Sequence, residues 1–122
     1  DKTKQALTRA VRQNHLAHAL LFDGPTGSPN LALALALATF VNCEEPGERD
    51  ACGRCAACVK MGKLVHPDLH LIFPVANTAK GKTAEAYLPD WRRFMLDAPY
   101  RTLAEWLDAT GAENKQGNIS VE

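Results

Sequence analysis

The 122-residue chain has 14 basic and 14 acidic residues, and its hydrophobic fraction of 46% is typical of a globular domain. A formal net charge of zero disfavours a protein whose main task is to bind nucleic acid, because domains that contact many phosphates are usually basic. No apolar run is long enough to span a membrane, and no signal-peptide core follows the N-terminus. We therefore expect a cytoplasmic domain, and because position 1 is not Met, we expect it to be part of a longer protein.

The first elements of the chain are predicted as a helix, a strand and a second helix. Residues 3–14 place small and apolar side chains at helical spacing, which predicts an amphipathic helix. The short apolar run of residues 19–22 predicts a buried strand. Residues 31–38 alternate leucine and alanine, two strong helix formers, and contain no β-branched residue. They predict a helix that ends near Val41 and is buried on most sides.

The turn between that strand and the second helix has the frame of a phosphate-binding loop. Gly24 takes the first glycine position of the pattern G-x-x-x-x-G-K-[ST], and Gly27 lies in the same turn. The positions for the second glycine, the lysine and the hydroxyl side chain hold Pro29, Asn30 and Leu31. The charge for the β- and γ-phosphates and the oxygen for Mg²⁺ are therefore missing, and proline also removes a backbone N–H. We predict a degenerate loop with weak or no ATP binding.

All four cysteines lie close together after the second helix. They are spaced C-x8-C-x2-C-x2-C and are Cys43, Cys52, Cys55 and Cys58. Four thiolates can close a tetrahedral zinc site without an open position, and such sites are structural. The sequence therefore favours a structural zinc module over residues 43–58.

Three other uses of the cysteines stay open at this point. Two disulfides fit the count, but they are uncommon in a chain without a secretion signal. An iron–sulfur cluster also takes four thiolates, although its usual spacings differ from this one. A redox-active C-x-x-C pair would need a βαβ setting that the pattern lacks. A metal assay would separate these alternatives.

The second half of the chain is predicted to add a short helix, a strand and two further helices. Residues 56–64 predict the short helix, and residues 69–73 predict a second buried strand, closed by Pro74. Residues 89–98 and 101–110 carry apolar side chains three and four positions apart, which predicts two amphipathic helices separated by a break at a proline.

Two tryptophans, Trp91 and Trp106, lie on the apolar stripes of these last helices. At helical spacing they are expected to pack in a core or a subunit interface, and not to form a platform for nucleic-acid bases.

The motifs up to residue 75 together resemble a known family. The order H-A-L-L-F-D-G-P-T-G (residues 18–27), an Ala/Leu helix, the four cysteines and H-P-D (residues 66–68) before an apolar strand resembles bacterial DNA polymerase III clamp-loader subunits. The resemblance covers roughly residues 3–75. Residues 76–118 do not match it and look like a helical insertion in a variant subgroup of the family. It implies an α/β fold, the N-terminal part of a P-loop AAA+ (Rossmann-like) domain into which the zinc module is inserted.

Within that family, the substitutions at Pro29, Asn30 and Leu31 favour the delta-prime kind of subunit over the ATP-hydrolysing gamma/tau kind. The resemblance then implies a non-catalytic subunit of the polymerase holoenzyme that helps load the sliding clamp in DNA replication. Its implied partners are the gamma/tau and delta subunits, with DNA contact indirect or weak. An active gamma/tau-type ATPase and a free-standing zinc-ribbon interaction module are the alternatives. The family's Walker B, sensor and arginine-finger residues would lie beyond Glu122, and no catalytic residue is assigned.

The resemblance also has a consequence for the two predicted strands. The AAA+ sheet order sets residues 19–22 and 69–73 apart, with later strands between them. In this chain both strands would have unpaired edges. We therefore expect that the chain self-associates or pairs these strands in a non-native way.

Overall fold

The computed structural model of the chain describes residues 2–75, 83–97, 103–109 and 119. The chain divides into two compact units, which we call the N-terminal unit (Asp1–Leu69) and the C-terminal unit (His70–Glu122). None of the helices in the described ranges is both long and apolar enough to cross a bilayer.

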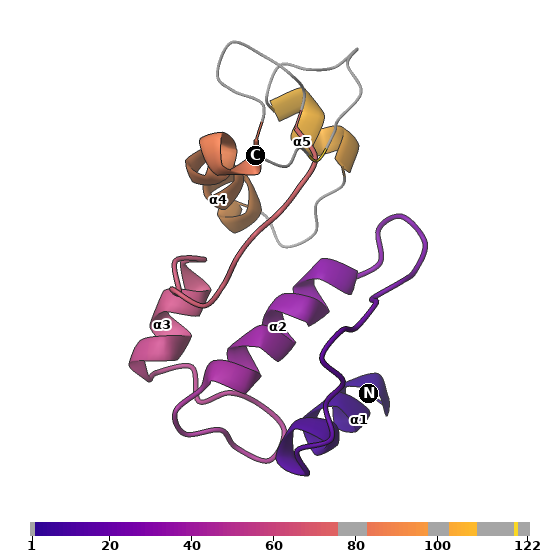
Figure 1. The fold of residues 1–122 in the computed structure, drawn as a ribbon, viewed down its shortest axis with the longest axis vertical. Helices are drawn as coiled ribbons and strands as arrows, with labels where there is room; N and C mark the ends of the chain where they lie inside the picture. The colour runs from indigo at the N-terminus through magenta and orange to yellow at the C-terminus, as the bar shows by residue number, and fades with distance from the viewer. Residues whose placement is uncertain (1, 76–82, 98–102, 110–118, 120–122) are drawn as a thin grey trace. The chain divides into compact units, whose positions relative to one another are not determined.

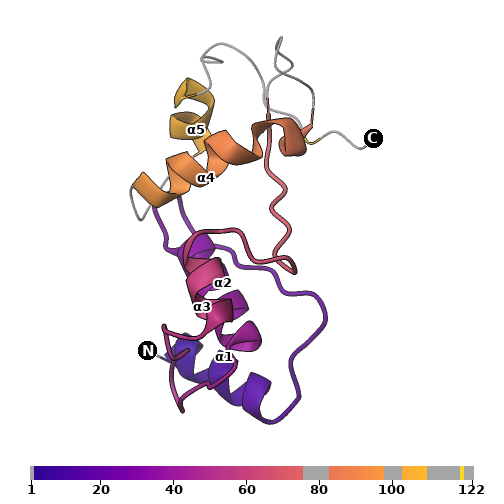
Figure 2. The same cartoon turned by 90° about the vertical axis from the view of Figure 1, so that its left-hand side faces the viewer.

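The N-terminal unit contains three helices: α1 (Lys2–Arg12), α2 (Asn30–Asn42) and α3 (Ala56–Gly62). The central helix α2 contacts both α1 and α3 (Figures 1 and 2). All three helices were predicted, and their observed ends lie within two residues of the predicted ones. Leu64 ends the short helix segment with a φ of 57°, a left-handed conformation that stops helical hydrogen bonding.

The predicted burial of α2 is wrong. Phe40 is its one buried residue, with 4% of its surface exposed, whereas Leu31 and Val41 are 40% and 48% exposed. The helix was expected to be buried on most sides. Within the described residues its covering elements are α1 and α3, so much of its apolar surface faces solvent.

The two predicted strands, residues 19–22 and 69–73, form no strand among the described residues, whose regular structure is helical apart from a single bridge residue, Val75. Their outward side chains are accessible, since Leu21 is 90% and Ile72 is 71% exposed. A strand is defined by hydrogen bonds to a neighbouring strand, and these segments have none in the described part of the chain. The helices agree with the predicted fold, but the α/β class remains a prediction.

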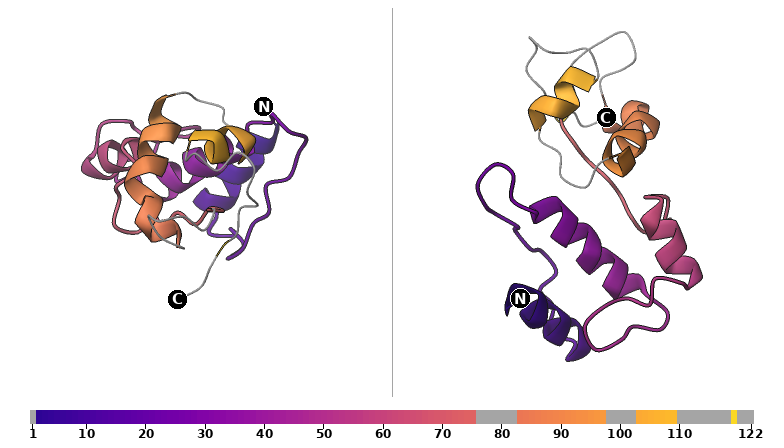
Figure 3. Two further views of the ribbon diagram at one scale, coloured as in Figure 1. Left: turned by 90° about the horizontal axis from the view of Figure 1, so that it is seen from above. Right: turned by 180° about the vertical axis from the view of Figure 1, so that it is seen from behind.

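The C-terminal unit contains a 3₁₀ turn, η1 (Ala84–Tyr87), followed directly by α4 (Leu88–Asp97), and then α5 (Leu103–Ala109). Both predicted helices are confirmed within two residues, and they contact each other (Figure 3). The predicted break at Pro99 lies outside the described residues. Pro89 occupies the second position of α4, where its missing N–H costs no helical hydrogen bond.

An aromatic core holds the C-terminal unit together. Trp106 is 1% exposed, and its indole Nε1–H donates a 2.8 Å hydrogen bond to the carbonyl oxygen of Pro74. Phe73 stacks on Trp91 with centroids 4.2 Å apart, and Trp106 meets Phe73 edge-on at 5.2 Å. The predicted packing of both tryptophans in a core is confirmed. Tyr87 completes the buried cluster with Val75.

Candidate metal centre and degenerate phosphate loop

The ends of two neighbouring helices bring the four cysteines together. Cys43 follows the last residue of α2, and Cys55 is the N-cap of α3, with Cys58 in the first turn of that helix. Because α2 packs against α3, these three side chains approach one another. Cys52 joins them through a turn at Gly53, whose φ of 75° favours glycine.

The four sulfur atoms have the spacing of a tetrahedral metal site. All lie within 4.8 Å of one another, with 3.9 Å between the Sγ atoms of Cys52 and Cys58 and 4.0 Å between those of Cys43 and Cys55. Zinc–sulfur bonds of about 2.3 Å place the sulfurs of a tetrahedron about 3.8 Å apart. A disulfide needs about 2.05 Å, and all four cysteines are free. The cluster could therefore hold a metal ion, and its four ligands would leave no open position.

Backbone N–H groups surround the sulfurs. The amides of Arg54 and Cys55 donate to the Sγ of Cys52 at 3.4 and 3.2 Å. The Sγ of Cys55 accepts from the amides of Glu44 and Cys58 at 3.5 and 3.4 Å, and the amide of Cys52 donates to Cys43 at 3.2 Å. These donors stabilise negative charge on sulfur, the form that binds a metal. Sequence reasoning missed them, because backbone donors depend on the turn geometry and leave no residue signature.

The surroundings give the thiols different acidities. The amides of Glu44 and Cys58 lower the pKa of Cys55 to about 6, and those of Arg54 and Cys55 lower the pKa of Cys52. Burial raises the pKa of Cys58 to about 12. A bound cation would favour the thiolate at every position, so binding of a metal ion here would release protons.

The predicted phosphate loop is folded onto itself. Gly27 has a φ of 91°, and the amide of Ser28 donates to the carbonyl oxygen of Pro25 at 3.0 Å. A Cβ added at Gly24 would lie 2.8 Å from the Ser28 Oγ and 3.0 Å from the Asn30 Nδ2, so these two side chains cover the glycine.

The three substituted positions of the loop lie at the start of α2. Pro29 is the N-cap of the helix without a side-chain cap hydrogen bond, Asn30 is its first residue, and Leu31 is 40% exposed. The turn from the extended segment into the helix is present as predicted. No cationic side chain stands at the position of the phosphate-binding lysine.

Comparison with known proteins identifies the relatives of this chain. The family model "DNA polymerase III, delta subunit" matches residues 1–116. The delta-prime subunit of DNA polymerase III from Bacillus subtilis (strain 168) is 30% identical over 97 residues, which cover 80% of this chain and 29% of that protein. The tau subunit from the same organism is 39% identical over 54 residues, or 44% of this chain and 10% of that protein.

A third relative is the delta-prime subunit from Escherichia coli (strain K12), which is 35% identical over 57 residues. That alignment covers 47% of this chain and 17% of the relative. The chain therefore spans less than a third of the length of the curated relatives that it matches. No solved structure matches it.

Proposed function

We propose a role in clamp loading on one premise: the chain belongs to the DNA polymerase III delta subunit family. The relative with the longest of the three alignments is named a delta-prime subunit, whereas the tau alignment covers less than half of the chain. We infer a delta-prime-like subunit that helps load the sliding clamp in replication, beside gamma/tau and delta subunits, in the cytoplasm. Its contact with DNA would be indirect or weak, in keeping with a net charge of zero.

The observation that carries a non-catalytic role is the composition of residues 29–31. An ATP-hydrolysing subunit needs lysine and a hydroxyl side chain at positions 30 and 31, and this chain has asparagine and leucine. Ser28 and Asn30 also cover the glycine that starts the loop, which supports a retained turn and not a phosphate cradle. The loop would then serve as a structural connection into α2.

Isothermal titration calorimetry with ATP and Mg²⁺ tests this proposal directly. We expect no measurable binding at millimolar ATP, and a gain of binding in the triple variant Pro29→Gly, Asn30→Lys, Leu31→Thr. Binding of ATP by the unchanged chain with a dissociation constant below a millimolar would refute the non-catalytic assignment. Co-purification of the chain with gamma/tau and delta subunits tests the partner assignment separately.

We also propose that the cluster of Cys43, Cys52, Cys55 and Cys58 is a structural zinc site. The tetrahedral spacing of the sulfurs, the backbone donors around them and the absence of disulfides among the four support this assignment. Bound zinc would hold the end of α2, the start of α3 and the insert between them in one arrangement.

Elemental analysis should find one zinc per chain. Replacement by Co²⁺ should produce the visible absorption of a tetrahedral thiolate site, and this absorption should disappear in the Cys52→Ser variant. A content of iron, or of no metal after purification without chelators, would refute the zinc assignment.

Finally, we propose that residues 19–22 and 69–73 are strands of an α/β AAA+ domain when neighbouring strands are present. Their apolar composition and the family membership support this. The family match extends through residue 116, and we propose that residues 76–118 are a helical insertion within the family domain. Slow amide exchange of residues 19–22 in a longer chain, compared with this one, would test the strand assignment.

A further inference from the structure

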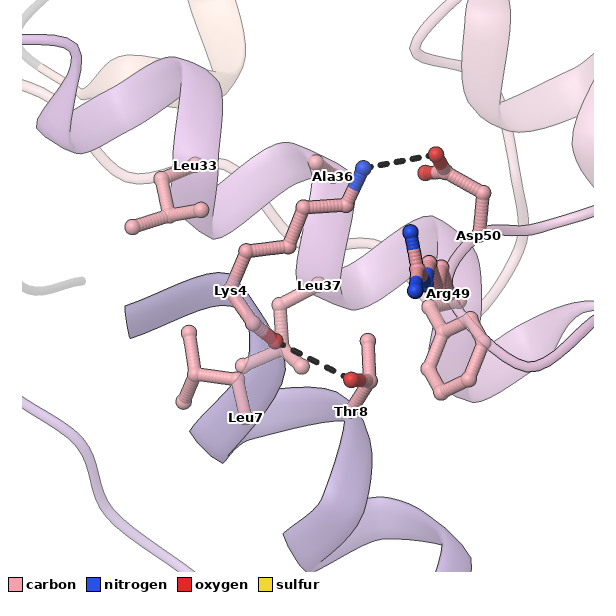
Figure 4. A pocket seen from close by; sticks show the side chains of 9 residues that line it. Lys4, Leu7, Thr8, Leu33, Ala36, Leu37, Arg49 and Asp50 are labelled. Carbon is pink, nitrogen blue, oxygen red and sulfur yellow. Dashed lines mark hydrogen bonds and ion pairs between the residues drawn. The ribbon is translucent and has the colours of Figure 1, made fainter. Parts of the chain in front are cut away.

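A hollow of about 130 Å³ lies between α1, α2 and the cysteine-rich insert (Figure 4). Its apolar lining comes from Leu7 on α1 and from Leu33, Leu37 and Phe40 on α2. The leucines are only half-buried, so the hollow opens to solvent. Its size suits one aliphatic side chain and is far too small for a nucleotide.

The mouth of the hollow is cationic. Lys4 Nζ pairs with the Asp50 carboxylate at 2.6 Å, which neutralises that lysine. Arg49, the neighbour of Asp50 in the insert, also lines the hollow. Within the part of the chain that the structure describes, Arg49 forms no ion pair with a carboxylate. Its guanidinium therefore supplies an uncompensated positive charge beside the apolar lining.

The helix α1, which also lines the hollow, adds positive charge. The sequence of α1, KTKQALTRAVR, contains four basic residues and no acidic one, although the chain as a whole is neutral. Arg12 follows Thr8, another lining residue, by one helical turn and so lies on the same side of α1. An apolar hollow bordered by cations is complementary to an apolar side chain bordered by carboxylates.

We propose that this hollow is a docking site for a partner protein segment that presents one aliphatic side chain flanked by acidic residues. The aliphatic group enters between Leu7, Leu33 and Leu37, and a neighbouring carboxylate pairs with Arg49. A nucleic acid would use the cations but leave the leucine lining unoccupied, because its backbone carries no aliphatic group of this kind. The proposal does not depend on the clamp-loading function.

The test uses the ¹⁵N-labelled chain as purified and the probe peptide acetyl-Asp-Glu-Leu-Asp-Glu-amide, followed by chemical-shift changes. Shifts should gather at α1, the first half of α2 and the insert. Replacing the leucine of the peptide by alanine should weaken binding about tenfold, since most of the buried aliphatic surface is lost. Equal affinity of the two peptides would overturn the proposal.

Matched variants of the chain separate the contribution of the Arg49 charge to peptide binding from that of the apolar lining. Arg49→Gln should weaken peptide binding about fivefold, as expected for an exposed ion pair, and Arg9→Gln, which removes a charge outside the lining, should have less effect. Ala36→Leu should weaken binding by filling the hollow, whereas Ala6→Leu, outside the lining, should not. Circular dichroism verifies that each variant is folded.

An oligodeoxythymidine tests the alternative that this face binds phosphate groups. If it binds more tightly than the leucine peptide at the same salt concentration, and Ala36→Leu leaves peptide binding unchanged, the face is a phosphate-binding surface and the proposal is wrong.

Discussion

Trp106 offers the sharpest test of the C-terminal unit. Its side chain is 1% exposed, meets Phe73, Trp91, Tyr87 and Phe94 at ring centroid distances between 5.0 and 6.4 Å, and donates its indole N–H to Pro74. Truncation of a buried aromatic residue to alanine costs about 3–5 kcal/mol of the free energy of unfolding. Small domains have a total of only about 5–15 kcal/mol. Trp106→Ala should therefore remove a large share of the free energy of unfolding of this unit.

Two further variants separate the parts of this cost. Trp106→Phe keeps an aromatic ring in the core but loses the hydrogen bond to Pro74. The free energy of unfolding should therefore decrease by about 0.5–1.5 kcal/mol for the hydrogen bond, and further because the phenyl ring buries less surface than the indole. Leu103→Ala changes a residue of the same helix that is 53% exposed, and its effect should be small.

The assay is urea denaturation at equilibrium, followed by tryptophan fluorescence, which every variant retains because Trp91 is unchanged. The midpoints should decrease in the order Leu103→Ala, Trp106→Phe, Trp106→Ala. If Trp106→Ala and Leu103→Ala shifted the midpoint equally, the aromatic cluster would not be the core of this unit.

Three further predictions concern the thiols and the unpaired segments. In the metal-free protein, iodoacetamide should modify Cys55 first and Cys58 last, and the rate at Cys55 should rise as the pH passes about 6. The reason is that backbone donors lower the pKa of the Cys55 thiol, whereas burial raises the pKa of the Cys58 thiol to about 12. Equal rates at the two thiols by mass spectrometry would contradict this. In the metal-loaded protein, both thiols should resist modification until a chelator is added, and a chelator without effect would count against ligation. The chain should self-associate through its exposed apolar segments. Because Leu21 is 90% exposed, Leu21→Lys should lower the molar mass measured by light scattering toward that of the monomer. A chain that is monomeric before the substitution would refute this.

The features that were predicted correctly are those in which local interactions dominate. The helix over residues 31–38 follows from the strong helix propensity of leucine and alanine, and it is present as α2. The cysteine spacing predicted one cluster of four thiols, because each of the two C-x2-C spacings needs only a single tight turn to bring its two sulfurs together. The loss of the phosphate-loop lysine is visible directly at Asn30.

Features that depend on distant parts of the chain were decided by the tertiary structure. A strand forms only when another strand supplies its hydrogen bonds, so the composition of residues 19–22 could not establish a sheet. The burial of α2 depends on what covers it, and Val41 remains exposed. The hollow beside Lys4 exists because Asp50, 46 residues away, is brought to it by the insert. The sequence alone determined the helices, the thiol cluster and the lost phosphate chemistry; contacts between distant residues decided burial, acidity and the candidate docking site.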